Sequence, residues 1–340
     1  MVLEETSRRS SVGMVLAFVF LIVILLVTDL LVIFLNFDLS GGEMGEADDR
    51  ENVVEEVVVD DDALDDETQE EVLPPVQDTL KINFQPVIDE FVATSGGKVG
   101  VVIYDVELDK IVGSYDADEK FQTASLYKLF PVYEGYLRVA TGEWDGDEII
   151  VNGKTVLECL DLAIRESNSP CAESLHRLIG YDMMDEIVAS KFGINNLSVR
   201  SLLATPTQIL DMMKIYYRHS EISDDVLVSR MLDSFLNQPR TIYNWRQGLP
   251  SGFSENVAVY NKVGWDYRID EENEEGEVIR GHWEIYNDAA IVDFVEDERE
   301  FIIIVMTNNV PYQKIRTFAT NFENYYNESK NSAFSSGVSD

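Results

Sequence analysis

The feature that most constrains this chain is an apolar run at residues 13–37, which reads GMVLAFVFLIVILLVTDLLVIFLNF. A helix rises about 1.5 Å per residue, so the run is long enough to cross a hydrocarbon layer of about 30 Å. Its one charged residue is Asp29, and a carboxylate at mid-membrane costs about 2.5–3.5 kcal/mol, which a run this apolar tolerates. We therefore expect one transmembrane helix, and any folded domain must come from the rest of the chain.

The charges around the run predict its orientation. Arg8 and Arg9 precede it, and the next basic residue is Arg50. By the positive-inside rule, residues 1–12 are expected in the cytoplasm and the remainder outside it, as a single-pass protein of the cell membrane. A cleaved signal peptide is the alternative, but the following DLSGGE has no A-x-A-like cleavage site and no Cys for lipid attachment. The anchor is favoured.

Residues 38–79 are dense in Asp and Glu, and Arg50 is their only basic residue. Mutual repulsion predicts an extended, disordered linker that ends near Pro74 and Pro75. A cation-binding or partner-docking tail is the alternative, yet no D-x-D-x-D-G spacing is present. The whole chain has a formal net charge of −37. Nucleic acid is therefore not expected as a partner, because its phosphates would meet a like-charged surface.

The cysteine and histidine content speaks against a metal centre. Three His and two Cys are scattered along the chain, whereas a zinc site needs ligands at short spacings. No metal and no cofactor is predicted. Cys159 and Cys171 could pair outside the membrane, but a disulfide must meet strict distances. Two buried, unpaired cysteines are the favoured interpretation.

Residues 80–328 are expected to form one mixed α and β domain, followed by a disordered tail at 329–340. Period-two and apolar patterns predict strands, and apolar residues at helical spacing predict helices. Thr205 and Pro206 have the character of a helix N-cap and first residue. The strands are expected within 98–116, 257–265, 282–294 and 299–309, and the helices within 125–142, 154–167, 170–180 and 205–219. Strands at both ends predict an α+β fold, with a sheet formed by the N- and C-terminal strands packed against a helical part.

Three short motifs carry candidate chemistry. The first is Ser125-Leu126-Tyr127-Lys128, in which Ser and Lys lie three apart and so share one face of a helix. A Ser hydroxyl is a poor nucleophile until a base takes its proton, and a desolvated Lys can be that base. Alone, the pattern also fits an exposed helix pair. The second motif is Ser167-Asn168-Ser169, and the third is Lys262-Val263-Gly264-Trp265.

In this order, the motifs resemble the S-x-x-K, S-D-N and K-T-G motifs of class A β-lactamases and penicillin-binding proteins. The flanks EKFQTASLYKL, TVLECLDLAIRESNSPCAESL and NDAAIV followed by EREFIIIVMT are similar to the corresponding segments of that family. The resemblance covers nearly all of the chain outside the anchor and the linker. It implies a β-lactamase/transpeptidase-like fold with an antiparallel sheet.

The resemblance also implies a role for each matching residue. Ser125 would be the acylated nucleophile, and Lys128 its base or proton relay. Ser167 would pass a proton to the leaving nitrogen, and Lys262 would supply positive charge near Ser167 and the substrate carboxylate. The backbone N–H groups of Ser125 and Trp265 would form the oxyanion hole, where one donor is worth about 2.7–4 kcal/mol.

The substrate-binding residues implied by the resemblance are Ser169, Val263, Gly264 and Trp265, and two of them depart from the family pattern. Ser169 stands where an Asn amide would hold the substrate, and Val263 replaces a hydroxyl residue. Gly264 is expected where the strand backbone approaches the substrate closely, and Trp265 is a candidate wall of the substrate site. The largest departure is that no Asp or Glu occurs from Ile187 to Leu210, where class A enzymes place the Glu that activates the deacylating water.

These residues predict a membrane-anchored serine hydrolase that is acylated at Ser125 by β-lactams or by D-Ala-ended peptidoglycan peptides. Without the usual Glu, an acyl-enzyme formed from a β-lactam is expected to hydrolyse slowly. The alternative is a degenerate relative that binds cell-wall peptide or a protein partner without catalysis. The lipid bilayer, through residues 13–37, is the other expected partner.

Overall fold

The computed structural model describes residues 80–238, 245–273 and 278–336. No helix within these ranges is long and apolar enough to cross a membrane. The cytoplasmic segment predicted at 1–12, the transmembrane helix at 13–37 and the acidic linker at 38–79 lie outside the described residues.

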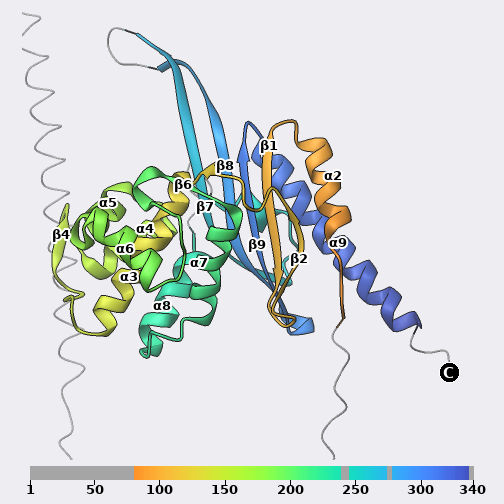
Figure 1. Ribbon diagram of the computed structural model, residues 1–340, viewed down its shortest axis with the longest axis horizontal. Coiled ribbons are helices and arrows are strands. Elements are labelled where there is room, and N and C mark those ends of the chain that lie inside the picture. Colours follow the sequence, from red (N-terminus) through yellow and green to blue (C-terminus); the bar gives the residue numbers. More distant parts are fainter. Residues whose placement is uncertain (1–79, 239–244, 274–277, 337–340) are drawn as a thin grey trace, which may run out of the picture. The chain divides into compact units, whose positions relative to one another are not determined.

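A five-stranded antiparallel sheet forms the centre of the folded part, in the order β2-β1-β9-β8-β7 (Figure 1). The first and last strands of the chain, β1 and β9, pair along the middle of the sheet, as the sequence predicts. The strands are β1 (Lys98–Asp105), β2 (Lys110–Tyr115), β7 (Val257–Glu272), β8 (Val278–Phe294) and β9 (Arg299–Asn308).

Helices cover both faces of this sheet (Figure 1). The terminal helices α2 (Gln85–Ser95) and α9 (Tyr312–Ser336) pack on one face, and α7 (Pro206–Arg218) lies against the other, next to the helical part. The helical part contains α3 (Leu129–Ala140), α4 (Val156–Arg165), α5 (Ser169–Ile179), α6 (Tyr181–Ser190) and α8 (Asp225–Leu236). The predicted α+β fold is confirmed.

Side-chain alternation along the strands builds two cores, one on each face of the sheet. Val101 and Ile103 of β1 pack with the terminal helices, whereas Val102 and Tyr104 pack with the helical part. Successive side chains of a strand point to opposite faces, so a strand that is covered on both sides must be apolar throughout. This explains the nearly continuous apolar run of β9, whose interior residues are buried.

Local capping fixes where the helices begin. Thr205 caps α7 by accepting a hydrogen bond from the backbone N–H of Gln208, whose side chain accepts in return from the backbone of Thr205. Pro206 is the first residue of that helix, as predicted. Thr155 and Glu158 form the same reciprocal arrangement at the start of α4. Such caps satisfy backbone donors that have no partner within the helix.

The C-terminal prediction is wrong for residues 329–336. Helix α9 runs on to Ser336, so the domain does not end at 328, and only residues 337–340 of the expected tail lie outside the described residues. Two contacts explain the longer helix. Lys330 forms an ion pair with Asp297 at 2.7 Å, and the ring of Tyr326 lies 4.2 Å from that of Phe294.

The prediction of two unpaired cysteines is also wrong, because Cys159 and Cys171 form a disulfide. The short connection between α4 and α5 folds the chain back, so the two Cα atoms lie 4.8 Å apart, within the range that a disulfide allows. Both side chains are fully buried. The bond joins the two helices that flank Ser167.

Strands β7 and β8 are longer than the other strands and project beyond them as a two-stranded ribbon (Figure 1). Strand β8 pairs with β9 only from Asp288 to Phe294. The base of the ribbon therefore leaves the sheet at Gly264 and Asn287, which are cross-strand partners.

Candidate active site

Ser125 lies in a short 3₁₀ helix, η1 (Ala124–Lys128), that follows the two-residue strand β3 (Phe121–Gln122). Strand β3 pairs with β6 (Leu203–Ala204). In a 3₁₀ helix, residues i and i+3 lie directly above one another, so Ser125 and Lys128 share a face as predicted. Ser125 is half-buried, and within the described residues its hydroxyl forms no hydrogen bond.

Lys128 is buried, with 1% of its surface exposed, and its amine points to the second motif. The Nζ atom donates to the backbone carbonyl of Ser167, to the Ser169 hydroxyl at 3.1 Å and to the Ser167 hydroxyl at 3.3 Å. Burial lowers the pKa of Lys128 to about 7. A desolvated amine with a pKa near neutrality is the kind of group that can accept a proton from a serine.

Ser167 is held between α4 and α5 in a left-handed backbone conformation, with φ of 55°. The following residue, Asn168, caps α5 by accepting a hydrogen bond from the N–H of Cys171 at 3.0 Å. The Ser167 hydroxyl accepts a second hydrogen bond from Lys262 Nζ at 3.0 Å. One hydroxyl is thus shared by two buried amines.

Lys262 is fully buried on β7, and its amine also donates to the carbonyl of Val263 at 2.7 Å. Burial and the nearby charge of Lys128 hold the pKa of Lys262 well below its usual value, whereas Asp288 raises it. The structure therefore brings Lys128, Ser167 and Lys262 into one cluster beside the turn that carries Ser125.

Gly264 allows β7 to approach that turn closely. A Cβ atom on Gly264 would lie 2.2 Å from the Thr123 carbonyl oxygen and 3.1 Å from the backbone nitrogen of Leu126. The sequence predicts a close approach of Gly264 to substrate, but the contact that excludes a side chain here is with the turn itself. The third motif is thereby pressed against the first.

The free edge of β7 faces the same turn. The carbonyls of Asn261 and Val263 accept hydrogen bonds from the side chains of Gln238 and Lys262, so they point away from β8. Backbone groups of alternate residues in a strand point the same way. The N–H of Trp265 is therefore directed to this free edge, next to Gly264, where an oxyanion-hole donor is expected.

The side chains of Val263 and Ser169 contact the protein itself, and their role in substrate binding stays a prediction. Val263 is 1% exposed, so its side chain is buried and does not line an open cleft; its carbonyl is what borders the cluster. Ser169 is the first residue of α5, and its hydroxyl accepts from Lys128 rather than standing free for a substrate.

Trp265 belongs to an aromatic cluster, so the substrate wall proposed for its ring stays a prediction. Its ring centroid lies 5.0 Å from that of Tyr286 and 5.5 Å from that of Trp245, and it stacks on Tyr312 at 5.8 Å. The indole of Trp245 donates to the carbonyl of Glu166 at 3.2 Å. The cluster thus connects the third motif to the residue before Ser167.

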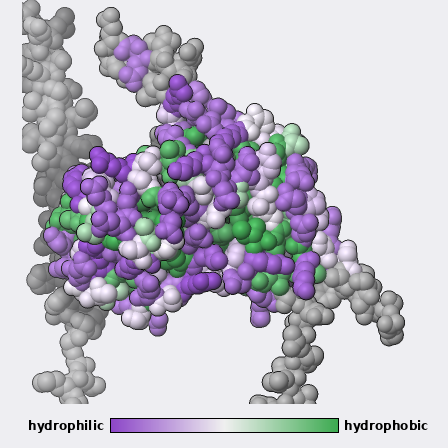
Figure 2. All heavy atoms as spheres, in the orientation of Figure 1, coloured by the Kyte–Doolittle hydropathy of each residue, from purple (hydrophilic) through white to green (hydrophobic). Residues whose placement is uncertain are grey.

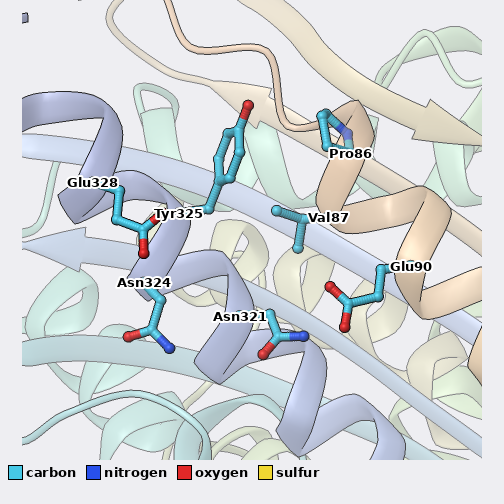
Figure 3. A pocket seen from close by; sticks show the side chains of 7 residues that line it. All are labelled: Pro86, Val87, Glu90, Asn321, Asn324, Tyr325 and Glu328. Carbon is cyan, nitrogen blue, oxygen red and sulfur yellow. The ribbon is translucent and has the colours of Figure 1, made fainter. Parts of the chain in front are cut away.

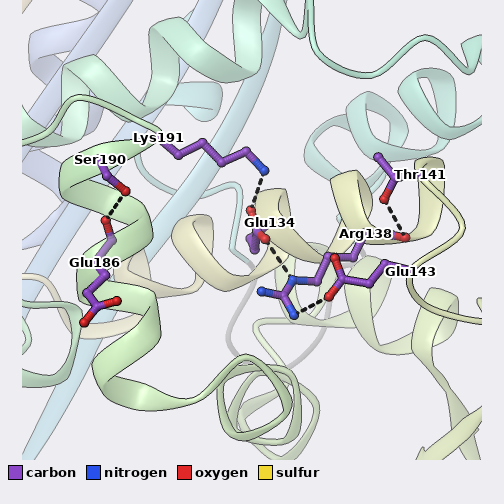
Figure 4. Close-up of polar contacts among 7 residues, drawn as sticks. All are labelled: Glu134, Arg138, Thr141, Glu143, Glu186, Ser190 and Lys191. Atoms are coloured by element: carbon purple, nitrogen blue, oxygen red, sulfur yellow. Dashed lines mark hydrogen bonds and ion pairs between the residues drawn. The ribbon is translucent and has the colours of Figure 1, made fainter.

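The segment between α6 and α7 contributes no carboxylate near the cluster. It is anchored at its start by Lys191, whose amine pairs with the buried Glu134 at 3.0 Å, and Arg138 pairs with the same carboxylate at 2.8 Å (Figure 4). It continues through the 3₁₀ turn η2 (Val199–Ser201) into β6, where Leu202 accepts from Thr123 N at 2.8 Å. The backbone of this segment, and not a carboxylate, therefore lies next to the turn that carries Ser125.

A separate hollow of about 250 Å³ lies between α2 and α9, on the face of the sheet opposite the helical part (Figure 3). It is lined by Pro86, Val87, Glu90, Asn321, Asn324, Tyr325 and Glu328. It contains none of the three motifs. Among the described residues, no group of three or more His, Cys, Asp or Glu side chains is placed to hold a metal ion.

Two buried polar residues that the motifs do not include hold this arrangement. Asn287 donates to the carbonyls of Gln122 at 2.7 Å and Thr123 at 3.2 Å, and accepts from Thr307 N at 2.8 Å. Asp288 accepts from Asn261 Nδ2 at 2.9 Å. Polar residues buried within a strand need hydrogen-bond partners, but the sequence does not show which partners these are.

Comparisons with known proteins agree with this fold. The chain resembles a variant of a reconstructed last common ancestor of Gram-negative class A β-lactamases, with a TM-score of 0.57 and 18% identity over 71% of this chain and 97% of that one. A β-lactamase from Xanthomonas campestris gives a TM-score of 0.57 and 14% identity over 69% of this chain and 94% of that one. At this identity, the likeness shows the fold alone. No curated protein matches the sequence.

The model of the β-lactamase enzyme family matches residues 83–325, which is most of the chain. The matched range contains all three motifs and both strands of the central pair, β1 and β9. The chain belongs to the β-lactamase enzyme family.

Proposed function

We propose that this protein is an acylating serine hydrolase that acts on β-lactams or on D-Ala-ended cell-wall peptides. The observation that carries the proposal is the Ser167 hydroxyl, which lies within hydrogen-bond distance of both Lys128 and Lys262. That cluster lies beside the turn of Ser125, which is half-buried and whose hydroxyl has no hydrogen-bond partner among the described residues. The positions of the three motifs supply a nucleophile, a base and a proton carrier in one place.

In the proposed reaction, neutral Lys128 takes the proton of Ser125 as its Oγ attacks the carbonyl carbon of the amide. The backbone N–H groups of Ser125 and Trp265 stabilise the negative charge that develops on the carbonyl oxygen. Ser167, which accepts from Lys128 and Lys262, passes a proton to the leaving nitrogen as the C–N bond breaks. Lys262 attracts a substrate carboxylate. The product is an acyl ester on Ser125.

Hydrolysis of that ester needs an activated water, and the segment from Ile187 to Leu210 provides no carboxylate for it. The proposed enzyme therefore releases β-lactam products slowly, and peptidase or transpeptidase chemistry suits it better. A non-catalytic relative is the second candidate, and the engagement of the Ser169 hydroxyl by Lys128 favours it. In that case the Lys128 amine only donates hydrogen bonds that hold the second motif in place, and it takes no proton from Ser125.

Labelling with a fluorescent penicillin, followed by intact-mass spectrometry, tests the proposal. We expect an adduct on the wild-type full-length protein and none on Ser125→Ala. A D-Ala-D-Ala peptide should give a shorter-lived adduct than the penicillin. If the wild type shows no adduct under conditions that label a known penicillin-binding protein, acylation is wrong and the non-catalytic function is supported.

We also propose that residues 13–37 anchor the protein in the cell membrane, with 1–12 in the cytoplasm, 38–79 as an acidic linker and the folded domain outside. The Cys159–Cys171 disulfide supports this orientation, because disulfides form mainly in oxidising compartments. Cell fractionation tests it. The full chain should sediment with membranes and a variant lacking 13–37 should not, and external protease should reach the folded domain.

A further inference from the structure

Asn287 is a buried polar residue at the point where the ribbon leaves the sheet, and the proposed mechanism does not use it. It lies on β8, fully buried, opposite Gly264 of β7. Residues directly opposite one another on antiparallel strands share a face of the sheet, and a Cβ atom on Gly264 would meet the turn that carries Ser125. The side chain of Asn287 therefore lies on the side of the sheet where the reaction is proposed to occur.

The amide of Asn287 connects that turn to the centre of the sheet. Its amino group donates to the carbonyls of Gln122 at 2.7 Å and Thr123 at 3.2 Å. Its oxygen accepts from the backbone N–H of Thr307, a residue of β9, at 2.8 Å. A primary amide has both donors and an acceptor, and Asn287 uses both kinds of group here. The two carbonyls that precede Ala124 are thereby tied to the central strands.

The turn held by these bonds contains a strained residue directly before the candidate nucleophile. Ala124 has a φ of 43°, in the left-handed region that residues with a Cβ atom rarely adopt. Such a conformation persists only where the surroundings enforce it. The backbone of Thr123 donates to the Leu202 carbonyl at 2.8 Å, and its carbonyl accepts from Leu126 N at 3.0 Å as well as from Asn287. That carbonyl belongs to the peptide plane from which φ of Ala124 is measured, so its hydrogen bonds fix one side of the rotation.

We propose that Asn287 is a positioning residue for acylation, which holds Ala124 in its left-handed conformation and so fixes the direction of the Ser125 hydroxyl and backbone N–H. This inference rests on the proposed function, in which these two groups are the nucleophile and an oxyanion-hole donor. Rotation at Ala124 turns the next planar peptide, which carries the N–H of Ser125. A purely structural role of Asn287 would change the stability of the domain, and its effect would not depend on residue 124.

The first test measures acylation of full-length Asn287→Ala by a fluorescent penicillin. We expect the rate at saturating penicillin to fall about tenfold, on the scale of one strained backbone residue, with the half-saturating concentration unchanged. Thr307→Val is the matched control, because it removes a hydroxyl that donates to the Tyr286 carbonyl at 2.6 Å beside the same junction. It should acylate at the wild-type rate. Wild-type acylation by folded Asn287→Ala, or an equal loss in Thr307→Val, would overturn the proposal. If Asn287→Ala does not fold, Asn287→Ser, which keeps one donor, replaces it in the same comparison.

A second substitution, Ala124→Gly, shows whether the loss acts through the strained residue. Glycine adopts a positive φ without the cost that a Cβ atom brings, so the turn depends less on Asn287. We expect Asn287→Ala/Ala124→Gly to acylate about tenfold faster than Asn287→Ala. Glu298→Gly is the matched control, because Glu298 is exposed, has a φ of 51° and lies between β8 and β9. No recovery with Ala124→Gly, or an equal recovery with Glu298→Gly, would overturn the proposal.

Amide hydrogen exchange, measured without substrate, separates this inference from the proposed function. The N–H of Leu126 donates to the Thr123 carbonyl, and its exchange rate reports how often the turn opens. We expect this amide to exchange several-fold faster in Asn287→Ala and at the wild-type rate in Thr307→Val. Unchanged exchange in folded Asn287→Ala would overturn the proposal. Failure of the wild type to acylate refutes the proposed function instead, and the exchange rates still decide whether Asn287 holds the turn.

Discussion

At the scale of single residues, the Ser167 hydroxyl is the point where the cluster converges. It accepts from Lys128 at 3.3 Å and from Lys262 at 3.0 Å, and both amines are buried. Two positive charges this close in a medium of low dielectric constant repel each other strongly. The arrangement therefore favours one charged and one neutral amine at a time. A proton can then pass between Lys128 and Lys262 through the Ser167 hydroxyl, which is hydrogen-bonded to both amines.

The pH dependence of acylation follows from Lys128. Burial lowers its pKa to about 7, and only the neutral amine can accept the Ser125 proton. Below this pKa the neutral fraction falls about tenfold per pH unit. The second-order rate of penicillin labelling should therefore rise with pH up to about 7 and then level off. Lys128→Arg, whose side chain stays protonated, should label about 10²–10⁴-fold more slowly. A rate that is independent of pH from 5 to 9 would contradict this role.

A substitution at Gly264 tests whether the close contact between β7 and the turn that carries Ser125 is needed. In Gly264→Ala the new Cβ would lie 2.2 Å from the backbone oxygen of Thr123, so backbone must move. We expect a loss of about 1–3 kcal/mol in the free energy of unfolding and slower acylation. Denaturant unfolding and labelling rates measure the two effects.

Gly146→Ala is the control for this variant. Its Cβ would lie 2.7 Å from a methyl of Leu157, a side chain that can rotate, and it is not part of the motifs. This control should label at the wild-type rate. Wild-type labelling by folded Gly264→Ala would show that the close approach is not needed.

At the scale of secondary-structure elements, the sequence predicts the pieces better than their pairing. Period and motif order predict β1, β9 and the helices around Ser167, because each pattern is local. They also predict where β7 begins and β8 ends, but not the ribbon, because β7 runs on from 265 to Glu272 and β8 begins at Val278, before residue 282. The hydrogen bonds of Asn287 and Asp288 depend on the register of β7, β8 and β9, which no local pattern specifies. The sequence does not predict the disulfide for the same reason, since its geometry depends on how α4 packs on α5.

The Cys159–Cys171 disulfide constrains the two helices that hold Ser167. It closes a short loop, with a sequence separation of 12 residues, that contains the whole second motif. Cross-links of this length typically stabilise by about 2–4 kcal/mol, mainly by restricting the unfolded chain. Cys159→Ala/Cys171→Ala should lower the free energy of unfolding by about this amount and slow acylation. Reductant should destabilise the wild type but leave the double variant unchanged, and equal sensitivity of both to reductant would contradict the assignment.

At the scale of the whole molecule, the chain is strongly acidic, whereas the proposed substrates carry a carboxylate. The chain carries a net charge of −37, and the face shown in Figure 2 is mainly hydrophilic, with small separate hydrophobic areas. Lys128 and Lys262 are buried, so an approaching substrate meets the surface charge before it meets the amines. The carboxylate of a substrate is therefore repelled at long range by the net negative charge of the chain and attracted at short range by the buried lysines.

Ionic strength separates these two effects. The Debye length is about 30 Å at 0.01 M salt and about 10 Å at 0.1 M, so added salt screens the surface repulsion, whereas buried contacts with Lys262 are screened much less. Labelling by a penicillin with a free carboxylate should therefore become several-fold faster between these salt concentrations. Its methyl ester carries no charge and should label at a rate that does not depend on salt, which serves as the control. A carboxylate penicillin that labels more slowly as salt rises would instead mean that attraction by the lysines extends beyond the cleft and dominates the approach.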